Sequence, residues 1–183
     1  MTGSAGWYSA ITAITRSSPG AANRAFCNCS TAWCGVNQSL HAEGEPDRDS
    51  FGIALRRARE VLRPGSLVIV ICDERALSDS AEQQLSLLSR HCDLLLLPLS
   101  DPLDHALPAA GLLRFTQRGS QLELDTLNFE LRQAYRAQAE ARQERWEILA
   151  QKLRILMMPL STQGDMVEQL REYLNPKRAG KSR

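Results

Sequence analysis

The chain has 183 residues, of which 43% are hydrophobic and 23% charged, and its formal net charge is +1. This near-neutral balance excludes a global field that would recruit nucleic acid or anionic lipid, and no apolar run approaches the ~20 residues that cross a bilayer. The N-terminal residues lack the basic region and the apolar region of a signal peptide, and the chain has an odd number of cysteines, five. We therefore expect a cytoplasmic protein with reduced thiols.

Residues 1–36 combine Gly, Ser, Ala, Thr and Cys with little sustained periodicity. Trp7, Tyr8, Ile11 and Ile14 would form at most one amphipathic turn. We therefore predict a poorly patterned leader, either disordered or a frame-shifted start. Residues 37–175 are the predicted domain, and the basic residues 176–183 are a solvated tail rather than a phosphate-binding arm.

Helical and strand patterns alternate from residue 49 onward. Asp49 or Ser50 is expected to cap the first helix, and Asp125 or Thr126 the long one. In chain order we predict a helix over 51–62, a strand over 67–72, a helix from about 79, a strand over 94–99, a short turn or helix from 101, a hairpin over 112–124, a helix over 127–153, a strand over 155–159 and a helix over 164–174.

The two longer strands are continuous apolar runs, "LVIVIC" and "LLLLPL", which is typical of strands buried on both faces. Strands of this kind that alternate with helices predict an α/β fold with a largely parallel sheet flanked by helices.

Polar residues follow both buried strands, with Asp73 after the first and Ser100 and Asp101 after the second. Ligands of open α/β sheets bind beyond these carboxyl ends, and grouped carboxylates and hydroxyls suit Mg²⁺. In the alternative structural interpretation, Asp73 solvates a strand end and Asp101 caps a turn. His105 next to Asp104 would allow acid–base chemistry, although a loop histidine is more often simply exposed.

The cysteines give little support for a zinc site. Cys27, Cys29, Cys34 and His41 have a first gap of one residue and no second knuckle, so we predict no zinc. The chain also lacks a P-loop, a Gly-x-Gly-x-x-Gly fingerprint and a Gly-x-Ser-x-Gly elbow. These absences favour a binding domain over a hydrolase or a dehydrogenase.

Four segments together resemble one protein family. They are "RPGSLVIVICDE", "SRHCDLLLLPLSDPLDHALPAAG", "LDTLNFELRQAYR" and "STQGDMVEQLREYL". They resemble the C-terminal half of the domain of unknown function 58 family, over about 49–174. The resemblance implies a bacterial protein with a von Willebrand A, Rossmann-like fold, whose gene commonly lies beside that of a MoxR-type AAA+ ATPase.

The resemblance also implies a metal rim, because Asp73 matches the third metal loop of von Willebrand A domains. However, the Asp-x-Ser-x-Ser of their first loop is absent, as are the strands expected before Phe51. We therefore expect either a fragment truncated on its N-terminal side or a divergent member, with weak Mg²⁺ binding at best. The exposed edge of the 67–72 strand would then cause association unless the leader covers it.

The leading functional hypothesis is a non-enzymatic protein-interaction domain that works with a MoxR-type ATPase in complex assembly or maturation. One alternative is a metal-dependent enzyme that uses Asp73, Asp101 and His105. Another is a non-functional fragment of a longer protein.

Overall fold

The computed structural model describes residues 10–14, 49–117 and 120–175. Its elements follow the chain in the order β1 (Ala10–Ile14), α2 (Ser50–Val61), β2 (Leu67–Asp73), the 3₁₀ helix η1 (Glu74–Ala76), α3 (Asp79–Leu88), β3 (Asp93–Ser100), α4 (Pro102–His105), β4 (Leu112–Gln117), β5 (Ser120–Asp125), α5 (Phe129–Leu153), β6 (Leu156–Met157), β7 (Leu160–Ser161) and α6 (Met166–Leu174). From residue 49 onward most of these are the elements that the sequence predicts, with ends shifted by a few residues. The exceptions are η1, which was not predicted, and the single strand predicted over 155–159, which is the two short strands β6 and β7.

One five-stranded sheet forms the centre of the molecule, with strand order β1-β2-β3-β6 and with β7 also paired to β3. Strands β2, β3, β6 and β7 run parallel to one another, and β1 is antiparallel to β2. The predicted α/β fold with a largely parallel sheet is therefore confirmed.

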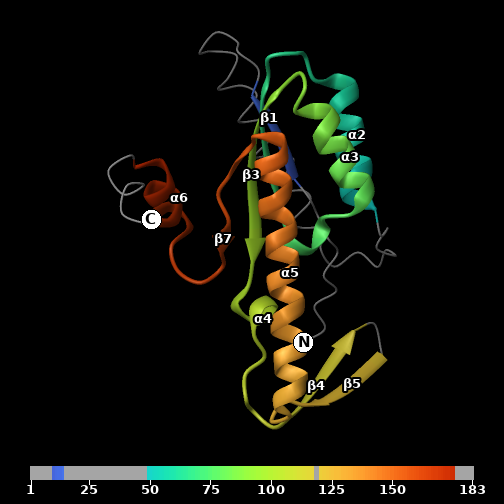
Figure 1. Ribbon diagram of the computed structural model, residues 1–183, viewed down its shortest axis with the longest axis vertical. Coiled ribbons are helices and arrows are strands. Elements are labelled where there is room, and N and C mark those ends of the chain that lie inside the picture. Colours follow the sequence, from blue (N-terminus) through green and yellow to red (C-terminus); the bar gives the residue numbers. More distant parts are fainter. Residues whose placement is uncertain (1–9, 15–48, 118–119, 176–183) are drawn as a thin grey trace.

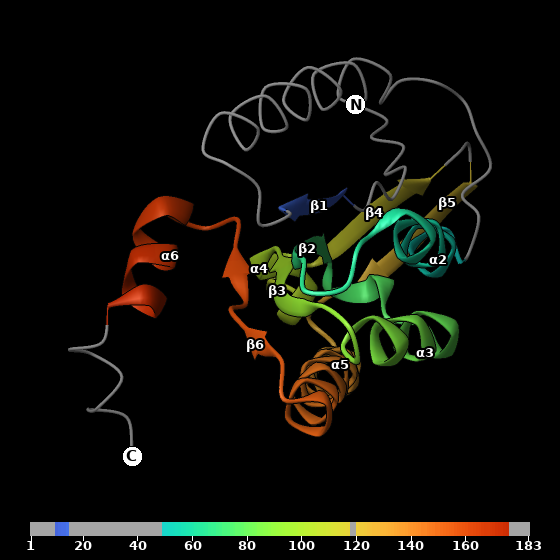
Figure 2. The same ribbon diagram turned by 90° about the horizontal axis from the view of Figure 1, so that it is seen from above.

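Helices cover the two faces of this sheet unequally. Helices α2, α3 and α5 lie on one side and α6 lies on the other (Figure 2). The first face carries the larger core, in which the fully buried Val68, Val70 and Leu96 of the strands pack against residues of all three helices. On the second face Leu170 of α6 packs beside a smaller cluster of Leu97, Met158 and Leu160. Most of the hydrophobic stabilisation therefore lies under α2, α3 and α5.

Strand β1 corrects the prediction of an unpatterned leader with one helical turn. Residues 10–14 form a strand that pairs in register with 67–71 of β2. The physical reason lies in β2, whose free edge would leave backbone N–H and C=O groups unpaired. The sheet thus extends beyond the predicted boundaries 37–175, and the leader covers the edge that we expected to cause association.

The start of α5 differs from the prediction as well. Asn128 caps this helix by accepting a hydrogen bond from the Leu131 N–H, rather than Asp125 or Thr126. Asp125 instead forms a local turn with the Leu127 N–H. Thr126 is fully buried, and its hydroxyl donates to the Gly111 carbonyl and accepts from the Ala110 N–H. Residues 110 and 111 are therefore tied to the start of α5.

An arm extends from the carboxyl end of β3 (Figure 1). We define the arm as residues 102–117 and 120–137, which comprise α4, the β4–β5 hairpin and the first half of α5. Thr126 is the only buried residue among those whose exposure is described in the arm. The remaining described residues are called the body, and it contains both apolar clusters.

Candidate functional site

The carboxyl ends of β2 and β3 lie at the same edge of the sheet. Asp73 ends β2 and pairs in parallel register with Leu99 of β3, so Ser100 and Asp101 follow directly beyond it. The sequence predicted this proximity from the order of the strands, and the pairing confirms it. We call Asp73, Ser100 and Asp101 the rim residues.

Asp73 serves as a backbone cap in the structure. Its Oδ1 accepts a hydrogen bond of 2.7 Å from the Arg75 N–H, which starts η1. Burial raises the pKa of the Asp73 carboxyl and nearby Asp104 raises it further, whereas the Arg75 N–H and guanidinium lower it. This carboxylate at the end of a buried strand therefore organises the turn that follows.

Asp101 also caps a helix start. Its Oδ1 accepts from the Leu103 N–H at 2.9 Å, and its Oδ2 accepts from the Thr162 hydroxyl at 2.6 Å. Asp104 completes a capping box by accepting from the Asp101 N–H at 2.8 Å. The hydroxyl of Thr162 and then the Leu103 N–H lower the pKa of Asp101. The carbonyl of Ser100 accepts from the Thr162 N–H, which joins the loop after β7 to the rim.

A group of charged side chains stands beside the rim residues. Arg75 forms an ion pair with Asp104. The side chain of Glu74 is only 8% exposed, with Oε2 at 3.5 Å from Nε2 of His105 and Oε1 at 4.0 Å from Nε of Arg142. Burial raises the pKa of Glu74, while His105 and Arg142 lower it. His105 therefore faces Glu74 and not Asp104, its neighbour in the chain. Sequence reasoning missed Glu74, although this residue directly follows Asp73.

The rim residues do not fit the divalent metal that the family resemblance implies. Both carboxylates already accept backbone hydrogen bonds, and the Arg75 guanidinium stands among the acids. Across residues 10–14, 49–117 and 120–175, no group of three or more His, Cys, Asp or Glu side chains is arranged to hold a metal ion. We therefore derive no chemistry through a metal at this edge.

The cysteines divide between described and undescribed residues. Cys72 and Cys92 are free and buried, as predicted. Burial raises the pKa of Cys72 to about 12, with a smaller contribution from the charge of Asp73. A thiol of this kind is a poor nucleophile at neutral pH. The other candidate zinc ligands, Cys27, Cys29, Cys34 and His41, lie outside the described residues.

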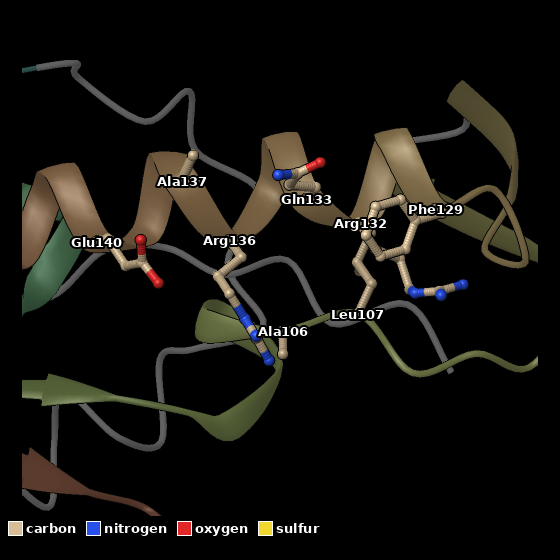
Figure 3. Close-up of a pocket in the computed structure, with 8 residues that line it drawn as sticks. All are labelled: Ala106, Leu107, Phe129, Arg132, Gln133, Arg136, Ala137 and Glu140. Carbon is tan, nitrogen blue, oxygen red and sulfur yellow. The ribbon is translucent and has the colours of Figure 1, made fainter.

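The structure has one pocket near the rim residues and a second one along the arm. A cavity of about 300 Å³ at the rim is lined by residues that include Glu74, Ser100, His105 and Trp146. A larger groove of about 540 Å³ runs along the first half of α5 (Figure 3). Sequence reasoning missed the groove, although its α5 residues recur at the three- and four-residue spacing of one helix face.

Comparison with known proteins places the chain in one family. The family model described as protein of unknown function DUF58 matches residues 32–145, and the chain belongs to this family. No curated protein and no solved structure matches the chain. Among the described helices, none combines the length and the apolar character that a bilayer crossing requires.

Proposed function

We propose that this DUF58 protein is a non-enzymatic protein-interaction domain, and that the arm supplies its binding surface. The observation that carries the proposal is the β4–β5 hairpin. In its antiparallel register, Leu113 faces Leu124 and Phe115 faces Leu122, so these four side chains share one face. Phe115 is 41% exposed and Leu122 is 57% exposed.

The opposite face of the hairpin is mainly polar. Arg114 and Glu123 stand directly across from each other there and form an ion pair. An isolated two-stranded hairpin is at best marginally stable in water, and gains stability when its apolar face is covered. Exposed apolar area next to polar surroundings is also characteristic of protein-binding sites. This amphipathic hairpin therefore supports a binding role.

The family resemblance supports a more specific partner. Genes of this family commonly lie beside those of MoxR-type AAA+ ATPases, so we propose such an ATPase as the partner, in the cytoplasm, during complex assembly or maturation. The largely parallel sheet, which the resemblance relates to von Willebrand A domains, would then be the scaffold for the arm. The caps formed by Asp73 and Asp101 are compatible with a scaffold that carries no reaction of its own.

The test is a binding measurement between the full chain and the purified MoxR-type ATPases of the same genome. We expect one of them to bind, and the double substitution Phe115→Ser with Leu122→Ser to weaken binding by at least about tenfold, which is typical for loss of apolar anchors. Leu112→Ser is the matched control, because Leu112 is 66% exposed on the opposite face of the same hairpin. If no such ATPase bound, the proposed partner would be wrong. Equal effects of the control and the double substitution would contradict the proposed surface.

A further inference from the structure

The groove along α5 has two walls of different origin. Phe129, Arg132, Arg136 and Glu140 lie along one side of the helix, and Ala106 with Leu107 forms the facing wall (Figure 3). The view shows the side chain of Arg136 extending from the helix toward Ala106. The groove thus offers a partner a helical stripe on one side and an irregular segment on the other.

Hydrogen bonds fix the two walls to each other. Tyr135 donates its hydroxyl to the Leu103 carbonyl at 2.8 Å, and Arg142 donates to the Asp104 carbonyl at 2.9 Å. At the other end, Arg132 donates to the carbonyl of Thr126, whose hydroxyl holds the Gly111 carbonyl. Walls that hydrogen bonds already hold together require less ordering when a ligand binds.

The chemistry of the groove is cationic beside an apolar surface. Phe129 is 68% exposed and presents its ring at one end. Arg136 forms no hydrogen bond or ion pair with any described residue, and Arg132 uses one N–H on the Thr126 carbonyl and keeps further donors. Glu140 lies one helical turn beyond Arg136 but does not pair with it among the described contacts. Within the described part of the chain, the groove therefore holds a guanidinium without a charge partner, and an exposed aromatic ring lies seven residues earlier on the same side of α5.

We propose that the groove binds an acidic segment of a partner protein, in which a carboxylate pairs with Arg136 and a neighbouring apolar side chain packs on Phe129. Charge complementarity argues for this occupant, because a planar guanidinium forms bidentate bonds with a carboxylate. A nucleic-acid backbone fits less well, because it presents a row of phosphates, whereas the groove follows its two arginines with Glu140 and offers no continuous basic track. The inference rests on the proposed role in protein binding and adds the chemistry of the bound segment.

The test selects random peptides displayed on phage against the full chain, and then measures the Kd of the enriched peptides. We expect enriched peptides to share an acidic residue beside an apolar one, and Arg136→Glu to weaken their binding at least tenfold. The matched control is Arg59→Glu, because Arg59 is an exposed arginine of α2 without a described partner. A peptide with its acid changed to Lys should regain binding to the Arg136→Glu variant, which shows that the variant is folded and that the charge contact is direct.

Several results would overturn the inference. These are enrichment of no acidic peptides, equal binding to the wild type and Arg136→Glu, or failure of the charge exchange. Self-association of the wild-type chain in sedimentation velocity that Arg136→Glu abolishes would instead identify a second copy as the occupant. Because hairpin substitutions test the ATPase and Arg136→Glu tests the groove, loss of one proposal leaves the other measurable.

Discussion

Trp146 and Phe129 are large aromatic residues of the same helix, α5, and they have opposite surroundings. Trp146 is 1% exposed, donates its indole N–H to the Glu74 carbonyl at 2.7 Å and lies 6.5 Å from the Phe51 ring, centroid to centroid. Phe129 is 68% exposed beside the groove. The helix passes from the sheet to beyond its edge, so one helix serves both the body and the arm (Figure 1). The residues that stabilise this fold are therefore separate from those that a partner can contact.

The largest expected effect is on the free energy of unfolding when each aromatic side chain is removed. Trp146→Ala should lower this free energy by about 3–5 kcal/mol, because it leaves a core cavity and an unpaired carbonyl. Phe129→Ala should change it by no more than about 0.5 kcal/mol, as is usual for an exposed side chain. Urea denaturation of the two variants and the wild type measures both values.

A large decrease in the free energy of unfolding for Phe129→Ala would contradict this contrast between the two aromatic residues. It would mean that the arm is packed in solution, either against the body or against a second copy. A concentration-dependent midpoint of unfolding would distinguish these two causes.

The next effect is a pH dependence of the free energy of unfolding, and it arises from Glu74 beside the rim residues. Burial raises the pKa of Glu74 in the folded chain above its ordinary value of 4.5, with His105 and Arg142 opposing, so the folded state binds this proton more tightly than the unfolded state. The contribution of Glu74 to stability must therefore decrease as pH rises from the ordinary value through the folded pKa. Glu74→Gln removes this dependence, so the stability of the wild type relative to the variant should decrease with rising pH in urea denaturation.

Asp101 provides a matched test with the opposite sign. The Thr162 hydroxyl and the Leu103 N–H lower its pKa below 3.8, so its contribution is present above that value and is lost as pH falls through the folded pKa. The wild type relative to Asp101→Asn should therefore gain stability with rising pH. If the wild type gained stability with rising pH relative to Glu74→Gln as well, burial would not be the main influence on Glu74.

The elements from residue 49 onward were predictable because each carries its own local pattern. The strand runs "LVIVIC" and "LLLLPL" are apolar throughout, and Pro64-Gly65 indicates the turn before β2, where Gly65 has a φ of +80°. Strand β1 has no comparable pattern, because its pairing is determined by the free edge of β2. An edge strand of this kind depends on tertiary context, which a local reading does not contain.

The candidate site was predictable only to the level of its strand ends. The order of the strands placed Asp73 and Asp101 at one edge, since consecutive parallel strands often pair. The contacts of Glu74 with His105 and of Arg75 with Asp104 depend on the directions of side chains beyond those ends, which no periodicity encodes. The groove was missed because most of its α5 residues are polar or charged, a composition that resembles an ordinary solvated helix face.

A smaller effect is expected from the caps of two helices. Asn128 caps α5 in the arm, and Ser78 caps α3 in the body by accepting from the Ala81 N–H at 3.1 Å. Each substitution by Ala should cost about 1 kcal/mol. For Ser78→Ala the loss should appear in global unfolding, whereas for Asn128→Ala it should appear mainly as faster hydrogen exchange at the start of α5. Equal losses in global unfolding would show that the arm and the body are coupled.

The smallest effect concerns the ion pair across the hairpin. Arg114 Nη2 lies 2.6 Å from Glu123 Oε1, and the two side chains are 63% and 46% exposed. Cross-strand pairs with this exposure contribute about 0.2–1 kcal/mol and weaken with added salt. A double-mutant cycle of Arg114→Ala and Glu123→Ala should therefore give a coupling of this size in hydrogen exchange of the hairpin, and less in urea unfolding of the whole chain. An equal coupling energy in hydrogen exchange of the hairpin and in global unfolding would mean that the hairpin unfolds together with the sheet, because only a cooperative unit transmits a local pair to the whole transition.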